Sequence, residues 1–383
     1  MPAVERRNPM NQSIHLLVCI SAHGWGHLAQ TVPIVGALRS RLPDLRITVR
    51  TGLDADLVRD RFRAVGQPAP DVLPDHSDFG FEMHDAITID DRRSIARYAA
   101  LHADPTWLDR ERDSLRALGV DAVVANIGYM PLAAAASLGL PAFGVSSLNW
   151  ADLLASRAHG RADVIAIAAS MRQAYATADR LFALVPGMPF DGFERRVRTA
   201  PIARRGRADR AGLRQALGVP TEQRIMMVAF GGLPMAFDTV RWQLPEGWSA
   251  ILFTQGTVET PTVIAAERLG WAYIDLLASC DLLVAKPGYG TFAEAGFASR
   301  DTLAVPRDDW PEAPWLIDWL AQHARCATIA LPELRAGRFE AGLAAIARQP
   351  ARLAADGDGA AEIADQIVSI IAQRQADNTP PTV

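Results

Sequence analysis

The same glycine turn occurs twice in the sequence, each time between an apolar run and a stretch that predicts a helix. Its two copies are GWGHLA at residues 24–29, after the apolar run 14–20, and GYGTFA at residues 288–293, after the run 281–285. Short apolar runs of this kind are typical of buried parallel strands, and paired glycines let the backbone turn tightly and come close to a ligand. The repeat therefore predicts an α/β fold with two halves, each built on a parallel sheet.

The length of the chain fits two such halves. Its 383 residues are too many for one ordinary core and suit two domains of roughly 150 to 200 residues each. A segment that is rich in arginine and poor in hydrophobic periodicity separates the halves, and we interpret it as a linker. The predicted parts are a disordered tail at 1–13, a first domain at 14–192, the linker at 193–213, a second domain at 214–357 and a C-terminal helix at 358–375.

Composition argues against several classes of protein. Apolar residues are 49% and charged residues 21% of the chain, which is typical of a globular protein. A net charge of −4 argues against nucleic acid as the main partner, because binding its phosphates requires a basic surface. No run approaches about 18 apolar residues, so no transmembrane segment is expected. Three isolated cysteines without a CxxC pair favour a cytoplasmic location, and no HExxH motif or His/Cys cluster indicates a metal site.

Each glycine turn is expected to bind an anion. A helix N-terminus has unpaired backbone N–H groups and a partial positive charge, so the helix after each turn offers a site for phosphate. Read literally, G-x-G-x-x-A is the dinucleotide-binding fingerprint. The second predicted strand of the first half, however, ends at residues 50–52 (RTG) with no acidic residue at its tip. The sequence therefore disfavours NAD(P), and the absence of a GxxxxGKS or GxxxxGKT motif disfavours a P-loop kinase.

Longer stretches around both turns resemble a known family. SAHGWGHLAQTVPIVGAL at 21–38 resembles the loop and helix that open the N-terminal domain of GT-B glycosyltransferases. VAKPGYGTFAEA at 284–295 and LAVPRDDWPEAPWL at 303–316 resemble the donor-site segment of that family, in the form found in the N-terminal part of arabinokinases and in UDP-N-acetylglucosamine transferases. The resemblance covers most of the chain. It implies two Rossmann-like domains that face each other across a cleft, with the donor on the C-terminal domain, the acceptor on the N-terminal domain, and the C-terminal helix crossing back to the first domain.

The resemblance assigns most of the expected site to a nucleotide-sugar donor, with a UDP-sugar favoured and no metal or other cofactor. The residues expected to hold the diphosphate are Gly24, Gly26, Gly231, Gly232, Lys286, Gly288, Tyr289, Gly290 and Thr291. For Gly24 and Gly26 the simpler alternative is turn geometry alone, and for Lys286 it is bracing of the loop. A metal is not required, because helix dipoles can offset the charge on the leaving diphosphate.

Three further residues are expected to contact the rest of the donor. Glu294 matches the carboxylate that accepts hydrogen bonds from the ribose hydroxyls in the family, and its alternative is a capping box with Thr291. Arg307 and Glu312 lie in the loop after the last predicted strand of this segment, where the family often contacts the transferred sugar. Their alternative is a surface ion pair.

His27 is the predicted catalytic base. It matches the loop histidine of the family, and an imidazole with a pKa near neutrality suits removal of a proton from an acceptor hydroxyl. The alternative is a histidine that only hydrogen-bonds the loop or the donor phosphate. His23 is the second candidate, with loop packing as its alternative. Gln30 occupies the position of a basic residue in the family, which weakens any inference about that contact.

The acceptor side is the least defined part of the expected site. Residues 66–91 are rich in Pro and Asp and predict a long loop, in which Asp78, His84 and Asp85 are the acceptor-side candidates. The function expected from the resemblance is an inverting, metal-independent glycosyltransferase with an unidentified acceptor. Two rivals stay open: a non-hydrolysing sugar-nucleotide epimerase of the same architecture, and a sugar-nucleotide-binding module without turnover.

Overall fold

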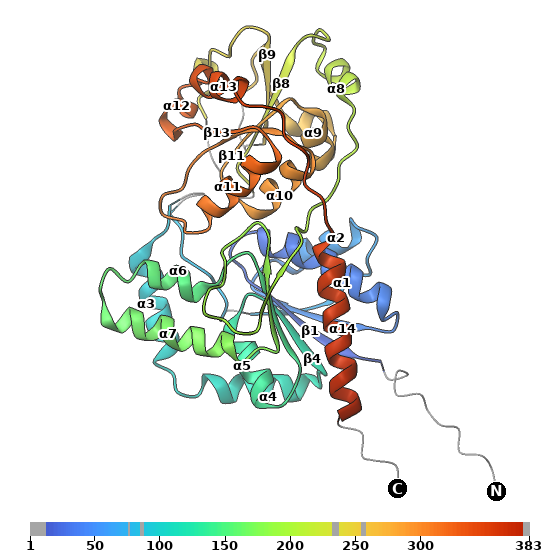
Figure 1. The fold of residues 1–383 in the computed structure, drawn as a ribbon, viewed down its shortest axis with the longest axis vertical. Coiled ribbons are helices and arrows are strands. Elements are labelled where there is room, and N and C mark those ends of the chain that lie inside the picture. The colour runs from blue at the N-terminus through green and yellow to red at the C-terminus, as the bar shows by residue number, and fades with distance from the viewer. Residues whose placement is uncertain (1–12, 76, 85–87, 232–236, 254–257, 378–383) are drawn as a thin grey trace, which may run out of the picture.

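Two parallel sheets, one in each of two domains, form the framework of the protein (Figure 1). The computed structural model describes residues 13–75, 77–84, 88–231, 237–253 and 258–377. In Figure 1 the first sheet lies in the lower domain, drawn in blue to green, and the second lies in the upper domain, drawn in yellow to orange. The predicted α/β fold with two Rossmann-like domains is therefore confirmed.

The first sheet has seven strands in the described part of the chain, and every neighbouring pair is parallel. Its order is β3-β2-β1-β4-β5-β6-β7. The strands are β1 (His15–Ile20), β2 (Arg46–Thr51), β3 (Asp71–Pro74), β4 (Ala122–Asn126), β5 (Ala142–Ser146), β6 (Arg180–Leu184) and β7 (Arg196–Thr199). The helices of this domain are α1 (Gly26–Arg41), α2 (Ala55–Arg63), α3 (Asp91–His102), α4 (Trp107–Leu118), α5 (Tyr129–Ser137), α6 (Trp150–Ser156) and α7 (Ala162–Ala176).

The second sheet has six parallel strands among the described residues, in the order β10-β9-β8-β11-β12-β13. The strands are β8 (Arg224–Ala229), β9 (Trp248–Phe253), β10 (Val263–Ala265), β11 (Leu282–Ala285), β12 (Asp301–Ala304) and β13 (Cys326–Thr328). The helices are α8 (Arg210–Leu217), α9 (Tyr273–Ser279), α10 (Tyr289–Phe297), α11 (Ala313–His323), α12 (Leu331–Arg335) and α13 (Glu340–Ala347). Both central strands β8 and β11 are apolar and buried beyond their first residues, as the strand pattern predicts.

The last helix, α14 (Gly359–Asp377), follows the second domain in sequence but packs against α1 of the first (Figure 1). Ile363, Ile367 and Ile371, spaced four residues apart, form its buried stripe. An ion pair joins Arg41 of α1 to Asp365 of α14 at 2.5 Å. The end of the described chain is thus held on the first domain.

Strand β7 was not expected, because residues 193–213 were assigned to the linker. Arg196–Thr199 instead pairs in parallel with β6 and extends the first sheet by one strand. Its sequence, RVRT, contains two arginines, and three of its four residues are exposed or only partly buried. A strand at the edge of a sheet has little apolar surface to bury, so it carries no apolar run for the sequence to reveal.

Tyr289 connects the second domain to the segment between the domains. Its hydroxyl accepts a hydrogen bond from the backbone N–H of Ile202 at 2.8 Å and lies 3.4 Å from the carbonyl oxygen of Val185, to which it donates. The side chain is buried. The side chain of Tyr289 therefore joins the start of α10 to the segments that follow β6 and β7 of the first sheet.

Tyr289→Phe should lower the free energy of unfolding by about 1–3 kcal/mol, because the Ile202 N–H would stay buried without a partner. Urea denaturation followed by circular dichroism measures this change. Tyr273→Phe is the matched control, since the Tyr273 hydroxyl lies 3.5 Å from the Thr291 hydroxyl and makes a weaker bond. Equal losses in the two variants would contradict the role assigned to Tyr289.

Candidate functional site

Both glycine-rich loops lie at the point where the strand order of their sheet reverses. In the first sheet this point is between β1 and β4, and in the second it is between β8 and β11. Open parallel sheets bind ligands in the crevice outside the carboxyl ends of the strands at such points. His27 follows β1, while Gly231 and Lys286 follow β8 and β11. The structure thus places predicted residues from both halves of the chain at the two positions where a ligand is expected.

His27 forms a hydrogen bond across the first of these points to Asn126, the last residue of β4. The distance from His27 Nδ1 to Asn126 Oδ1 is 2.7 Å. The amide nitrogen of Asn126 donates to the carbonyl oxygen of His27, to Gln30 Oε1 at 3.0 Å and to Thr31 Oγ1 at 3.2 Å. Because the amide N–H₂ group serves these acceptors, Oδ1 faces the imidazole and accepts the Nδ1 proton. The Nε2 atom of His27 is then the unprotonated nitrogen.

Burial keeps this imidazole neutral. The side chain of His27 is 5% exposed and packs edge-on against Trp150, with ring centroids 5.4 Å apart. Burial lowers the pKa of His27 to about 4, and the hydrogen bond that His27 donates to Asn126 opposes that shift. At neutral pH the imidazole of His27 is therefore unprotonated at Nε2, as a base must be, and the hydrogen bond to Asn126 keeps the remaining proton on Nδ1.

Asn126 was not among the residues expected from the sequence. The only signal for it was a polar residue at the end of the apolar run AVVAN, which many strands share. Its significance comes from the pairing of β4 with β1, in which Asn126 stands beside Ile20. That pairing joins segments about a hundred residues apart, and no local pattern reports it.

His23 is packed between two tryptophans. Its ring stacks on Trp310 with centroids 5.3 Å apart and meets the edge of Trp150 at 5.4 Å. Its Nδ1 lies 3.1 Å from the carbonyl oxygen of Phe81. Burial, together with the charges of His27 and Arg307, lowers the pKa of His23 to about 3. These contacts favour loop packing over catalysis for His23.

The loop between β12 and α11, residues 305–312, brings the second domain onto the first. Its Trp310 stacks on His23, and Asp309 accepts a hydrogen bond from the backbone N–H of Ile89 at 3.3 Å. Arg157 of the first domain lies 3.9 Å from the same carboxylate. The loop therefore crosses the boundary between the domains beside the two histidines.

Arg307 and Glu312 of this loop are buried, so the alternative of a surface ion pair is wrong. Their exposed fractions are 9% and 4%. The guanidinium of Arg307 lies over the Trp310 ring at 4.6 Å, and Glu312 accepts from the indole N–H of Trp310 at 3.0 Å. Among the described residues, Arg307 Nη2 and Glu312 Oε1 have no hydrogen-bond partner. Buried polar atoms are usually paired in folded proteins, so these two are suited to a polar ligand.

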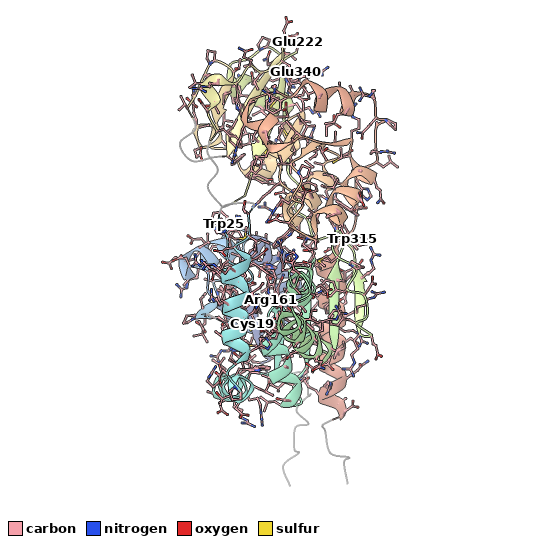
Figure 2. The ribbon with its side chains drawn as sticks, turned by 90° about the vertical axis from the view of Figure 1, so that its left-hand side faces the viewer. Cys19, Trp25, Arg161, Glu222, Trp315 and Glu340 are labelled. Atoms are coloured by element: carbon pink, nitrogen blue, oxygen red, sulfur yellow. The ribbon has the colours of Figure 1, made fainter. Side chains whose placement is uncertain are left out.

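The glycine turns face open space on both domains. A side-chain carbon added at Gly24, Gly26, Gly288 or Gly290 would meet no atom within 4 Å. Gly24 has a φ of +76°, which itself favours glycine, so turn geometry accounts for part of its identity. Trp25, between the first two glycines, is 44% exposed and lies at the level where the domains meet (Figure 2).

Lys286 lies beside Gly231 on the second domain. Its Cε is 4.0 Å from the position of a side-chain carbon on Gly231, which has a φ of +77°. Its charge also contributes to the lowered pKa of His23, on the opposite domain. Helix α10 begins beside it, after Gly288, so the N–H groups of its first turn have no acceptor within the helix. Gly232, also expected at this point, lies outside the described residues.

Glu294 forms an ion pair with the segment between the domains. Its carboxylate lies 2.7 Å from Arg204 Nε and is largely buried. Burial raises the pKa of Glu294, and the charge of Arg204 opposes that shift. Helix α10 has no side-chain cap, so the structure does not show the capping box with Thr291 that was the alternative.

No protein-family model matches the chain. Among curated proteins, it is 25% identical over 309 residues to L-arabinokinase of Arabidopsis thaliana, a match that covers 79% of this chain and 29% of that relative. The chain thus spans less than a third of the length of this relative, to which it is distantly homologous.

Solved structures match along nearly the whole chain. The glycosyltransferase SnogD from Streptomyces nogalater has a TM-score of 0.55 and 20% identity, and the match covers 94% of this chain and 100% of SnogD. The glycosyltransferase VinC in complex with dTDP has a TM-score of 0.58 and 15% identity, over 95% and 100% of the two chains. A protein of Listeria monocytogenes assigned as a UDP-N-acetylglucosamine 2-epimerase has a TM-score of 0.54 and 12% identity, over 97% and 99%. The chain has the GT-B fold.

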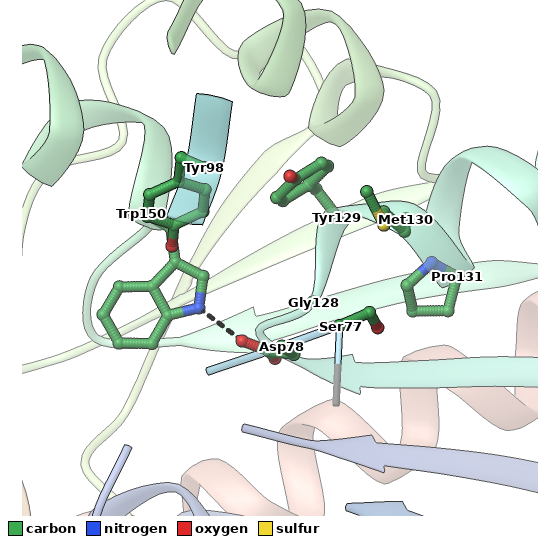
Figure 3. Close-up of a pocket in the computed structure, with 8 residues that line it drawn as sticks. All are labelled: Ser77, Asp78, Tyr98, Gly128, Tyr129, Met130, Pro131 and Trp150. Carbon is green, nitrogen blue, oxygen red and sulfur yellow. Dashed lines mark hydrogen bonds between the residues drawn. The ribbon is translucent and has the colours of Figure 1, made fainter. Parts of the chain in front are cut away.

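The acceptor-side candidates of this GT-B chain do not form one group. The Asp78 carboxylate accepts from the indole N–H of Trp150 at 2.9 Å and lines a cavity of about 10 Å³ together with Tyr98 and Tyr129, which is room for about one water molecule (Figure 3). His84 is exposed, with its Nε2 3.7 Å from Asp90. Asp85 lies outside the described residues. Asp78 is therefore partly buried and bonded to Trp150, whereas His84 points to solvent, so the two do not share one site.

The described part of the GT-B chain offers no ready metal site. Within it, no group of three or more His, Cys, Asp or Glu side chains is placed to hold a metal ion. None of the helices described there has the length and apolar character of a membrane span.

Asp78→Asn should change how stability depends on pH. Burial, with a smaller contribution from the charge of Asp75, raises the pKa of Asp78 from 3.8 to about 7. The folded protein therefore holds a proton that the unfolded chain releases, and this group's contribution to the free energy of unfolding falls as pH rises between these two values. Urea denaturation at pH 5 and pH 8 should show the variant gaining stability relative to the wild type at the higher pH. If the free energies of unfolding of variant and wild type differ by the same amount at pH 5 and pH 8, the raised pKa of Asp78 is contradicted.

Proposed function

We propose that this protein is a glycosyltransferase that moves a sugar from a nucleoside diphosphate to a hydroxyl or other nucleophile of an acceptor. The observation that carries the proposal is the hydrogen-bonded pair of His27 and Asn126. This pair sits at the switch point of one sheet, and Lys286 and the start of α10 lie at the switch point of the other. A neutral imidazole and a cationic, N–H-rich turn are the two parts that a sugar transfer requires.

The donor is a nucleoside diphosphate sugar, with uridine favoured over thymidine and guanosine. Its diphosphate lies at Lys286, Gly288, Gly290 and Thr291, where the helix dipole and the lysine charge offset the negative oxygens. VinC, a glycosyltransferase of the same fold, is solved in complex with dTDP, which supports a nucleoside diphosphate as part of the donor. Arg307 and Glu312 contact the sugar through the polar atoms that lack partners in the described residues.

Glu294 binds the ribose hydroxyls. Its carboxylate accepts from Arg204 Nε, and a carboxylate has enough lone pairs to accept from a ribose hydroxyl at the same time. Arg204 then holds the carboxylate in its charged form, since its charge opposes the effect of burial on the pKa of Glu294. The segment between the domains thus takes part in donor binding through one side chain.

The reaction is a single displacement. The acceptor oxygen gives its proton to His27 Nε2 and forms a bond to the anomeric carbon, while the bond from that carbon to the phosphate oxygen breaks. Its electron pair stays on the leaving diphosphate, next to Lys286 and the α10 N–H groups. One displacement inverts the configuration of the anomeric carbon.

A sugar-nucleotide epimerase is the second candidate, because one structural neighbour is assigned that activity. An epimerase requires no acceptor and converts one nucleotide sugar into another. Incubation with the donor alone, followed by proton NMR of the product, separates the two functions: an epimerised nucleotide sugar supports the epimerase, and a free nucleoside diphosphate with free sugar supports transfer to water.

Lys286→Ala should abolish donor binding. In a thermal-shift screen with UDP-, dTDP- and GDP-sugars, the best ligand at a hundredfold excess over its dissociation constant should stabilise the wild type by about 2.7 kcal/mol. The variant should lose this shift, because it lacks the cation next to the diphosphate. Arg116→Ala, which removes an exposed cation of α4, should keep it. If the nucleotide sugar still stabilises Lys286→Ala by the same amount, the diphosphate does not bind at Lys286.

His27→Ala should keep the thermal shift with the donor and lose turnover by about 100-fold or more, the usual contribution of a general base.

Asn126→Asp should raise the pKa of His27 by placing a negative charge at Nδ1. A base works only when unprotonated, so the acid limb of the pH–rate profile for donor hydrolysis should move from about pH 4 in the wild type to higher pH in this variant. An unmoved limb would mean that His27 is not the base or that Asn126 does not position it.

A further inference from the structure

The second domain has a groove at the edge of its sheet where the strands start, opposite their carboxyl ends. The groove has a volume of ≈ 550 Å³ and is lined by residues at or just before the starts of five strands, among them Arg224 of β8 and Trp248 of β9. In a parallel sheet these starts lie together, at the far edge from the strand ends that face the first domain. Glu222, two residues before β8, lies at the far end of the upper domain in Figure 2. The groove is therefore separate from the proposed donor site.

Positive charge dominates the lining of this groove. Five arginines contribute to it, against two carboxylates, whereas the whole chain has a net charge of −4. The arginines are Arg210, Arg224, Arg300, Arg325 and Arg352. A local excess of cations on an acidic protein is expected to attract anions to this position.

Three of these arginines are already engaged. Arg325 forms two hydrogen bonds to Asp301, the closer at 2.5 Å, and Arg210 lies 3.2 Å from Asp281. The guanidinium of Arg300 is buried and donates to two backbone carbonyl oxygens. These contacts hold part of the lining in place and neutralise both carboxylates.

Arg224 and Arg352 are exposed and available. Among the described residues, neither guanidinium has an ion pair or a hydrogen bond, and Arg224 lies over the Trp248 ring at 5.6 Å. They come from different parts of the chain, the start of β8 and the segment after α13. Leu343 and Ile346 of α13 add apolar surface to the same groove. The groove thus combines two unpaired guanidiniums with an aromatic and aliphatic wall.

We propose that this groove binds a small organic molecule that carries two or more phosphate or carboxylate groups. Guanidinium groups bind both kinds of anion through paired N–H donors, and the apolar wall accommodates the organic part. The volume falls in the range of small-molecule pockets. A nucleic acid is disfavoured, because it requires a broad basic surface and the charge here is confined to one groove.

The test uses the full chain with Lys286→Ala, which removes the cation of the proposed donor site, and two probes, inorganic pyrophosphate and citrate. Isothermal titration should show binding of at least one probe, and hydrogen exchange should show protection of residues 222–226 and 343–352. The double variant Arg224→Gln/Arg352→Gln in the same background should bind about tenfold more weakly or worse, since two charge-assisted contacts are lost.

Arg348→Gln is the matched control, because Arg348 is exposed at the end of α13 and does not line the groove. It should bind the probes as the background protein does. Circular dichroism of each variant checks that the fold is unchanged. Absence of binding by both probes, equal affinity in the double variant, or protection confined to residues 286–294 would each overturn the proposal. None of these outcomes depends on whether the protein transfers a sugar.

Discussion

The hydrogen bond between His27 and Asn126 is the contact on which the candidate site depends. It joins the first turn of α1 to the last residue of β4, at 2.7 Å. It forms only because β1 and β4 are parallel neighbours in the register that sets Ile20 beside Asn126. The side-chain amide then sets which imidazole nitrogen carries the proton. A change in the register of these two strands would therefore alter the protonation of the site as well as its shape.

A second constraint is that the site belongs to neither domain alone. Trp310 of the second domain stacks on His23 of the first, Tyr289 bonds to the segment between them, and α14 returns to pack on α1. One apolar cluster includes Leu28 of α1 and Phe292 of α10, so the domains share part of a core. Because three contacts from different segments join the domains, their relative position is set by packing and not by the linker alone. Substitutions far from His27 are thus able to misplace it relative to the donor side.

The sequence was informative where the signal is local. Apolar runs and glycine turns predicted the central strands, both α/β domains and the loops at Gly24 and Gly288, because a buried strand and a tight turn each need particular residues in a row. It was uninformative where the signal comes from pairing between distant segments: Asn126 is defined by its neighbour strand and β7 by its place at a sheet edge. Asp78 was assigned to the acceptor side because it lies in the long loop at 66–91, yet its carboxylate accepts a hydrogen bond from the indole of Trp150. The family resemblance supplied residues such as Glu294 and Arg307, whose partners only the fold reveals.

A neutral partner for the histidine has a chemical consequence for the proposed transfer. A carboxylate at Nδ1 would stabilise the imidazolium that forms as the acceptor loses its proton, whereas the Asn126 amide offers only a dipole. Burial already lowers the pKa of His27 to about 4, so the base is always available at neutral pH but accepts a proton weakly. In the proposed transfer, lowering the barrier then falls mainly to the groups of the second domain that would bind the diphosphate, where charge develops. In the proposed transfer Lys286 and the first-turn N–H groups of α10, which have no acceptor within the helix, stabilise that charge, so the larger share of the proposed catalysis falls on departure of the leaving group.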